Sequence, residues 1–237
     1  PAADGPYRNC SGEQRDAMSP EADRGSAGRV LGICALWAAL HSLLATKGFK
    51  DFVHQTVGAR YRDGLYRLAY NTQAVATLAL AARYFLRLPD RDLYRAAPPF
   101  SWLLRAAQAL SLGVLLSGVR VVGFLDFAGI ARLRNLLTGV DSGPEPEAQG
   151  PPLDARGAVV EAGAFRFTRH PGNLGALGFF LFLPRMTVNR AVLTAMVALY
   201  VILGSMHEEQ RLRAAYGAAY ERYRRSVSFM VPRPPRG

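Results

Sequence analysis

The chain has 237 residues, half of them hydrophobic, and its 29 Lys and Arg against 18 Asp and Glu give a formal net charge of +11. Basic proteins often bind nucleic acid, but these arginines flank long apolar runs, as in the cytoplasmic loops of membrane proteins, so no nucleic-acid partner is expected. Two cysteines without a CxxC pair exclude a disulfide framework, and no metal site is predicted.

The first 28 residues are polar and lack apolar periodicity. This composition predicts a disordered and dispensable tail over residues 1–28, followed by a single membrane domain over residues 29–237. The tail also lacks the order of charged, apolar and small residues that marks a cleaved secretory signal.

Four or five membrane-spanning helices are expected after the tail. Residues 30–46 carry no formal charge and would form a helix of about 25 Å, just long enough to cross the hydrocarbon core. The second span, 64–86, has arginines near its ends that can extend to the membrane surface, and the third is 98–119. Residues 172–183 and 187–206 predict a tight helical hairpin whose first arm is short for a full span.

Two segments between the third span and the hairpin do not have the composition of a span. Residues 121–137 mix apolar and charged side chains, which is typical of an interfacial helix, and residues 138–163 form a loop rich in Pro and Gly. Lys and Arg concentrate after the first span, around this loop and after the hairpin, which places those parts and the C-terminus in the cytoplasm and 87–97 outside. The predicted fold is all-α, a polytopic integral membrane helical bundle of about five transmembrane helices with a C-terminal hairpin and an interfacial helix.

The stretch TRHPGNLGALGFF (168–180) places Arg169, His170 and Pro171 directly before an apolar segment with glycines at 172, 175 and 178. Glycines at this spacing let a neighbouring helix approach closely. We expect Arg169 and His170 to bind a polar ligand at the cytoplasmic mouth of the bundle. The alternative is an Arg–His pair that merely extends to the membrane surface at the start of a helix.

A second polar cluster, HEEQRL (207–212), ends the last apolar helix. Two adjacent carboxylates there are costly unless they meet cations or a ligand. In a continuous helix, one face would carry a carboxylate, a leucine and three tyrosines: Glu209, Leu212, Tyr216, Tyr220 and Tyr223. This face is interpreted either as part of a ligand pocket or as an amphipathic helix on the membrane surface with aromatic anchors.

The order TRHP, HEEQRL, YGAAYERYRRSV and VPRPP resembles the RHP…EExxL…FGxxYxxY…P pattern of the isoprenylcysteine carboxyl methyltransferase-like membrane methyltransferases. The stretches ALHSLLATKGFKDF, YRLAYNTQ and RMTVNRAVLTAMVALYVILG are similar to the bacterial branch of that family, which includes the methanethiol S-methyltransferases. The resemblance covers roughly residues 30–233.

The resemblance implies an integral membrane enzyme, in a bacterial inner membrane, that binds S-adenosylmethionine on the cytoplasmic side between the RHP segment and the EE helix, within residues 164–237. It implies catalytic roles for Arg169 and Glu208. It implies cofactor contacts for six further residues: His170, Pro171, Gly175, Glu209, Leu212 and Tyr220. The methyl acceptor would be a small thiol or a lipophilic molecule that reaches the protein at the lipid bilayer. Asn173 stands where many family members have a tyrosine, so the aromatic lining of the pocket is not carried over.

Two other functions stay open. A membrane reductase of the sterol and steroid reductase type has a similar RHP stretch but uses NADPH; against it, Ala176 stands where such reductases tend to have an acid. A non-catalytic membrane assembly or transport factor could use the same helices. His41, a lone histidine in the first span, is expected to be a hydrogen-bonded packing residue, with a role in a site as the alternative.

Overall fold

The computed structural model describes residues 20–146 and 148–232, and the regular secondary structure of these residues is almost entirely helical. The helices are α1 (Pro20–Ala45), α2 (Lys47–Val57), α3 (Ala59–Phe85), α4 (Phe100–Val122), α5 (Phe124–Ala128), α6 (Ile130–Thr138), α7 (Pro171–Leu181), α8 (Val188–Tyr216) and α9 (Ala218–Ser226). A 3-10 turn, η1 (Gly163–Arg166), and two short strands, β1 (Asp92–Arg95) and β2 (Arg185–Thr187), complete the fold. The prediction of an all-α helical bundle is confirmed.

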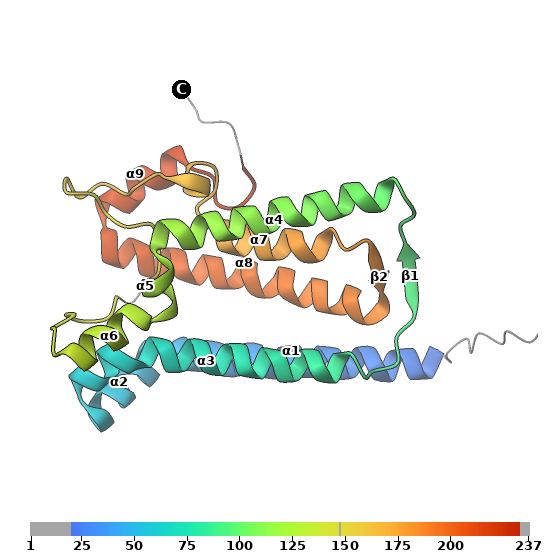
Figure 1. Cartoon of the computed structure of the whole chain (residues 1–237), viewed down its shortest axis with the longest axis horizontal. Helices are drawn as coiled ribbons and strands as arrows, with labels where there is room; N and C mark the ends of the chain where they lie inside the picture. Colours follow the sequence, from blue (N-terminus) through green and yellow to red (C-terminus); the bar gives the residue numbers. More distant parts are fainter. Residues whose placement is uncertain (1–19, 147, 233–237) are drawn as a thin grey trace, which may run out of the picture.

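The bundle has two sides that α8 joins. Helices α1 and α3 lie along one side and α4 and α7 along the other, while α8 packs against both α1 and α7 (Figure 1). Helices α2, α5, α6 and α9 gather at one end of the bundle, and β1 pairs with β2 in an antiparallel ribbon at the other end. The segments that the positive-inside rule groups together therefore do lie at one end.

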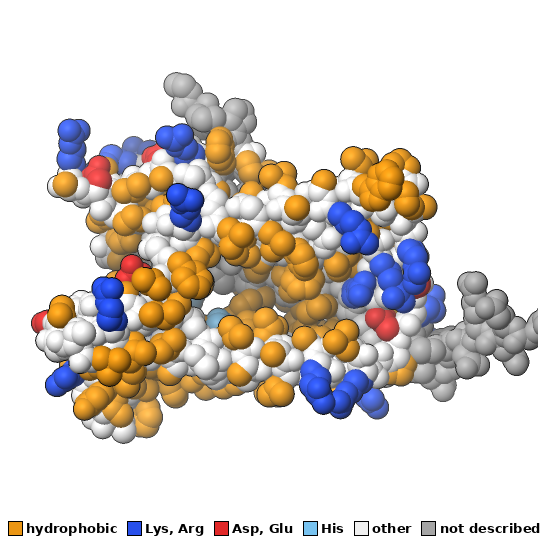
Figure 2. Space-filling view, in the orientation of Figure 1, with side chains coloured by type: hydrophobic (Ala, Val, Ile, Leu, Met, Phe, Trp, Pro, Cys, Tyr) orange, Lys and Arg blue, Asp and Glu red, His pale blue; other side chains and the backbone are white. Residues whose placement is uncertain are grey.

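Three of the described helices are long and apolar enough to cross a membrane: α1 over Arg24–Ala45, α4 and α8. Helix α7 has 11 residues, or about 16 Å, and is too short for a full span, as the sequence predicts. Large hydrophobic side chains such as Leu36, Leu80 and Leu110 stay exposed on the outer faces, as a lipid environment allows (Figure 2). The total of about five spans stays a prediction.

The predicted disordered tail ends earlier than the sequence suggests. Residues 20–28 belong to α1, and the buried Ser26 donates a hydrogen bond from Oγ to the carbonyl oxygen of Pro89 at 2.7 Å. The prediction of disorder is wrong for this part, because the helix continues through the polar residues to reach the α3–β1 connection. Residues 1–19 of the predicted tail lie outside the described residues.

The prediction of one continuous helix through residues 209–223 is also wrong. Gly217, with φ 53° and ψ −128°, ends α8 at Tyr216 and starts α9 at Ala218. Side chains other than glycine rarely adopt such a positive φ, so this glycine permits the sharp turn. The turn folds α9 back onto the end of α8 and creates the main buried cluster of hydrophobic residues: Ala148, Phe165, Leu212, Tyr220, Tyr223 and Val227.

Helix α7 is held tightly against α4. A Cβ atom at Gly175 would collide with the carbonyl oxygen of Ser111, and one at Gly178 would lie 2.5 Å from the Ser111 Oγ atom. The predicted close approach through the glycines is therefore observed at two of the three positions. Because α7 begins at Pro171, this contact also fixes the RHP motif relative to the bundle.

Candidate functional site

The RHP motif connects η1 to α7, and the C-terminal segment after α9 holds its backbone in place. The Arg169 N–H donates to the carbonyl oxygen of Ser228 at 2.9 Å, and Thr168 Oγ1 donates to that of Phe229 at 3.3 Å. His170 precedes α7 without capping it through its side chain, so its ring can turn toward α8. Residues about 60 positions apart in the chain thus build one site.

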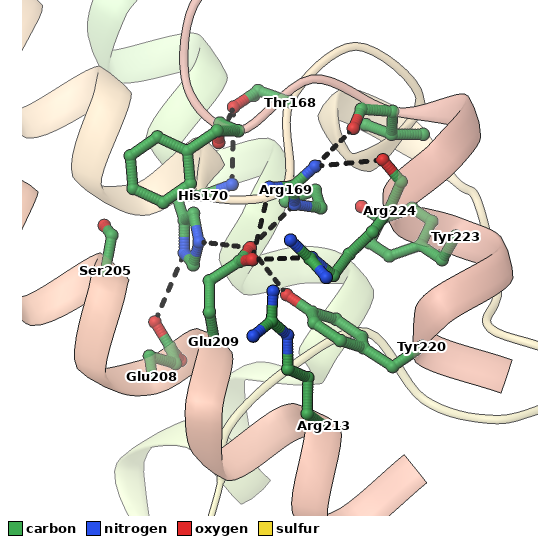
Figure 3. Close-up of polar contacts among 12 residues, drawn as sticks. Thr168, Arg169, His170, Ser205, Glu208, Glu209, Arg213, Tyr220, Tyr223 and Arg224 are labelled. Atoms are coloured by element: carbon green, nitrogen blue, oxygen red, sulfur yellow. Dashed lines mark hydrogen bonds and ion pairs between the residues drawn. The ribbon is translucent and has the colours of Figure 1, made fainter. Parts of the chain in front are cut away.

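Glu209 is the centre of this site, and five hydrogen bonds converge on its carboxylate (Figure 3). Oε1 accepts from Arg169 Nε at 2.6 Å and from Tyr220 Oη at 2.9 Å, and lies 3.2 Å from His170 Nε2. Oε2 accepts from Arg169 Nη2 at 3.2 Å and from Arg224 Nε at 3.0 Å. A buried charge needs this kind of compensation.

His170 lies between the two adjacent carboxylates. Its Nδ1 is 3.4 Å from Glu208 Oε2, while its Nε2 faces Glu209 Oε1. Burial opposes a charge on His170, but the hydrogen bonds and negative charges of Glu208 and Glu209 outweigh it and raise the pKa of His170 above its usual value. Because both nitrogens face carboxylate oxygens, which only accept, the geometry favours the imidazolium form with two N–H donors.

The two carboxylates differ in access to solvent and ligands. The Glu208 side chain is 30% exposed, whereas that of Glu209 is 8% exposed. Figure 3 shows Glu208 on the side of His170 opposite the arginines, near Ser205. Glu208 therefore has free acceptor capacity at an open edge of the site, and the acceptor capacity of Glu209 is already used within the protein.

The third guanidinium nitrogen of Arg169 also has hydrogen-bond partners within the chain. Its Nη1 donates to the carbonyl oxygens of Val227 at 2.6 Å and Arg224 at 3.2 Å. Tyr220 is fully buried beside Glu209, and burial together with that negative charge raises the pKa of its phenol, which therefore stays a donor. With His170 charged, the three cations Arg169, His170 and Arg224 meet the carboxylates of Glu208 and Glu209, and Arg224 also pairs with Glu221 at 3.0 Å.

Several residues predicted to touch a cofactor lie in packing positions. Pro171 contacts Gly118 of α4, since a Cβ there would lie 2.8 Å from the proline ring, and Gly175 of α7 packs against α4. Leu212 is buried against the loop at Gly150. Their predicted cofactor contacts stay predictions. Arg169, His170, Glu208, Glu209 and Tyr220, by contrast, are brought together as the sequence predicts.

Three further residues belong to the site; the motif does not point to Arg224 or Phe229, and it marks Asn173 only as a departure from the family pattern. Arg224 is one of several arginines in the RYRR run, and only the turn at Gly217 brings it to Glu209. The ring of Phe229 meets His170 edge-on at 5.1 Å, and the Arg169 guanidinium lies 5.7 Å from its centre. Asn173, which replaces the usual family tyrosine, donates to the buried Ser205 Oγ at 2.7 Å.

Comparison with known proteins identifies relatives over most of the chain. It is 24% identical over 200 residues, 84% of its length, to methanethiol S-methyltransferase 1 of Bradyrhizobium diazoefficiens. It is also 24% identical to the methanethiol S-methyltransferases of Pseudomonas deceptionensis over 202 residues and of Mycobacterium tuberculosis over 215 residues. The resemblance to this type of membrane methyltransferase is therefore confirmed.

These relatives are longer than the region they share with this chain. The matched region spans 65% of the Bradyrhizobium protein, 70% of the Pseudomonas protein and 78% of the Mycobacterium protein. The chain thus spans about two thirds to three quarters of the relatives it matches. No family model and no solved structure matches the chain.

Proposed function

We propose that this chain, which is similar over most of its length to methanethiol S-methyltransferases, transfers a methyl group from S-adenosylmethionine to a small thiol or lipophilic acceptor at the cytoplasmic side of a membrane. The observation that carries the proposal is the position of Glu208 and His170. The partly exposed carboxylate of Glu208, on a helix that is long and apolar enough to cross a bilayer, lies beside the charged imidazole of His170.

The chemistry of these side chains fits the proposed methyl donor. S-adenosylmethionine carries an ammonium, a carboxylate and a sulfonium, so its site needs an acid, N–H donors and an aromatic face. Glu208 supplies an accessible acid, the imidazolium of His170 supplies a positive charge while its two N–H groups face Glu208 and Glu209, and the half-buried ring of Phe229 supplies an aromatic face beside them. When bound, the donor supplies an electrophilic methyl group on its sulfonium.

In this proposal the two adjacent acids have different roles. Glu208 binds the ammonium of the donor, whereas Glu209 is a positioning residue that holds His170 and Arg169 through its five hydrogen bonds. Methyl transfer proceeds by in-line displacement, so the protein contributes mainly by aligning the reactants and excluding water. A buried hydrogen-bond network whose rearrangement costs much free energy is suited to holding the reactants in alignment.

Calorimetric titration of the detergent-solubilised protein with S-adenosylmethionine tests the proposal. Glu208→Gln should weaken binding by about tenfold or more, since a hydrogen bond to a charged group contributes about 1.5–3 kcal/mol. The matched control is Glu161→Gln, which removes an exposed carboxylate near α9 and should bind normally. Equal affinity in the parent and Glu208→Gln would contradict the proposed role of Glu208.

Thermal unfolding separates methyl transfer from the reductase alternative. A ligand that binds the native state at about 100 times its dissociation constant adds about 2.7 kcal/mol of stability. S-adenosylmethionine should therefore raise the melting temperature and NADPH should not. Stabilisation by NADPH alone would favour the reductase, and stabilisation by neither would favour a non-catalytic role.

A further inference from the structure

A second group of polar and aromatic side chains lies away from the RHP site, where α1, α3 and α8 meet. This ring cluster consists of Trp37, His41, Tyr70 and Tyr200. The Trp37 and His41 rings stack at 4.6 Å with an angle of 14° between their planes, and Tyr70 lies 4.6 Å from His41 on α3. Tyr200 of α8 approaches both Trp37 and His41 edge-on, at 5.6 and 6.1 Å.

The two nitrogens of His41 have different surroundings. Nε2 lies 2.6 Å from Tyr70 Oη, and the same hydroxyl lies 3.5 Å from the carbonyl oxygen of His41. If Tyr70 donates to that carbonyl, it accepts from Nε2–H, and Nδ1 then carries a free lone pair. Nδ1 is buried and makes no hydrogen bond with any described residue. An ionisable side chain inside a membrane helix with an unused nitrogen is costly, and such residues usually serve a function.

The two sides of the bundle leave a hollow between them. Figure 2 shows a hollow in the face between α3 and α4, with hydrophobic side chains on its visible walls. The closest helix packing is α4 with α7 and α1 with α8, so α8 bridges the two sides behind the hollow (Figure 1). A small apolar molecule dissolved in the bilayer can approach α3 and α8 from this side.

Helix α8 connects the ring cluster to the RHP site. Tyr200 and Glu208 are eight residues apart, which corresponds to a rise of about 12 Å and a rotation of about 80° around the helix. Glu209 is rotated by about 180° from Tyr200 and so faces the opposite side. Glu208, the accessible acid, is thus the member of the pair that is oriented closer to the ring cluster.

The geometry points to the ring cluster as the binding site of the methyl acceptor, a small apolar thiol, with His41 Nδ1 as the base that takes its proton; this inference rests on the proposed function. Aromatic rings make favourable contacts with sulfur and exclude water. The S–H bond breaks as its proton moves to Nδ1, and sulfur forms a bond to the methyl carbon. The bond from that carbon to the donor sulfonium breaks, so the donor product and the methylated acceptor are both neutral thioethers. The proton on His41 then leaves to solvent.

Histidine-specific NMR tests thiol binding without any methyl donor. The chain has four histidines, so full-length protein labelled with 15N-histidine in detergent gives few ring signals, and His41→Gln identifies those of His41. Added methanethiol should shift the Nδ1 signal of His41 saturably and leave the others in place. No shift at His41 would overturn the acceptor site, whether or not the protein transfers methyl groups.

Kinetics of methyl transfer to methanethiol test the base. His41→Gln should lower kcat by about a hundredfold or more, as loss of a general base does, with an unchanged dissociation constant for S-adenosylmethionine. Tyr70→Phe keeps the ring and its packing but removes the hydroxyl that accepts from His41 Nε2–H. Because the tautomer with a free Nδ1 lone pair is then no longer favoured, KM for the thiol should rise by about tenfold. The exposed His54→Gln is the matched control and should behave as the parent.

The outcomes separate this inference from the proposed function. An active parent with an equally active His41→Gln variant would overturn the role of His41 and leave methyl transfer intact. An inactive parent that does not bind S-adenosylmethionine would contradict the proposed function, and the thiol-induced shift at His41 would still decide whether the cluster binds a thiol.

Discussion

The two ends of the helical bundle are held together by different kinds of interaction. At the RHP end, the side chains of Arg169 and Glu209 are each 8% exposed and join in a network of buried charges. At the strand end, Asp92 and Arg185 form an ion pair at 2.5 Å, but their side chains are 39% and 45% exposed. An ion pair of similar length thus has a very different environment at each end.

The buried side-chain contacts at the strand end join mostly neutral groups, although Asp90 Oδ1 also accepts from the Asn189 N–H at 3.0 Å. Asn189 Nδ2 donates to Ser26 Oγ at 2.8 Å and to the carbonyl oxygen of Pro89 at 2.9 Å, which ties α8 to α1 and to the segment after α3. Neutral groups suffice to fasten helices together. Buried charges cost more free energy than this task requires, which is consistent with the chemical role that we propose for the charges of the RHP site.

Removing the central carboxylate should have the largest effect on stability. Glu209→Gln leaves Arg169, His170 and Arg224 buried or half-buried without their shared anion. Breaking one partner of a buried ion pair costs about 3–5 kcal/mol. Chemical unfolding in detergent should show a decrease of this size in the free energy of unfolding. A decrease below about 1 kcal/mol would mean that the network stabilises the fold no more than an exposed surface ion pair does.

Packing between α4 and α7 should contribute the next largest effect. Gly175→Ala places a methyl group against the backbone of Ser111 and Leu115, and overpacking of this kind costs about 1–3 kcal/mol. Gly172→Ala in the same helix is the control, because no atom lies within 4 Å of its Cβ position. If both variants unfold alike, charges alone hold the RHP motif against the bundle.

The charge on His170 should make the stability of the RHP end depend on pH. The folded state raises the pKa of His170, so it binds the proton more tightly than the unfolded chain, whose histidines titrate near about 6.5. Its contribution is therefore complete below that pH and declines as the pH rises through the folded pKa. Unfolding curves of the parent and His170→Gln should converge with rising pH, and parallel curves would show that His170 stays neutral.

The exposed ion pair at the strand end should give the smallest effect. Asp92→Asn removes the partner of Arg185, but solvent already screens this pair, and the antiparallel ribbon keeps its backbone hydrogen bonds. We expect the melting temperature and the binding of S-adenosylmethionine to match those of the parent. A clear loss of stability would remove the contrast between the two ends.

Local composition predicted most of the helical framework. The spans expected at 30–46, 98–119 and 187–206 correspond to α1, α4 and α8, because a long apolar run has few alternatives in a bilayer. The short arm of the hairpin and the loop at 138–163 were predicted for similarly local reasons. Each of these features depends on residues that are neighbours in the chain.

Local composition did not predict which distant segments of the chain pair with one another. The predicted turn before 187 contains β2, whose partner β1 comes from the segment 87–97, about 90 residues earlier. Periodicity grouped Glu209 with Tyr220 on one helical face; they do meet, at 2.9 Å, but only because Gly217 folds α9 back. The motif identified Arg169, His170, Glu208 and Glu209 but not Arg224, and the fold gives the two acids different environments.

The C-terminal segment that crosses the RHP motif also sets an order of events during synthesis. Glu209 follows Arg169 by 40 residues and Val227 follows it by 58, so Arg169 leaves the ribosome before either partner does. At about 5–20 residues per second, Arg169 waits about 2–8 s for Glu209. During that interval its charge must remain hydrated at the membrane surface. The site can therefore close only after the hairpin has entered the bilayer, when translation has delivered the last turn of α9.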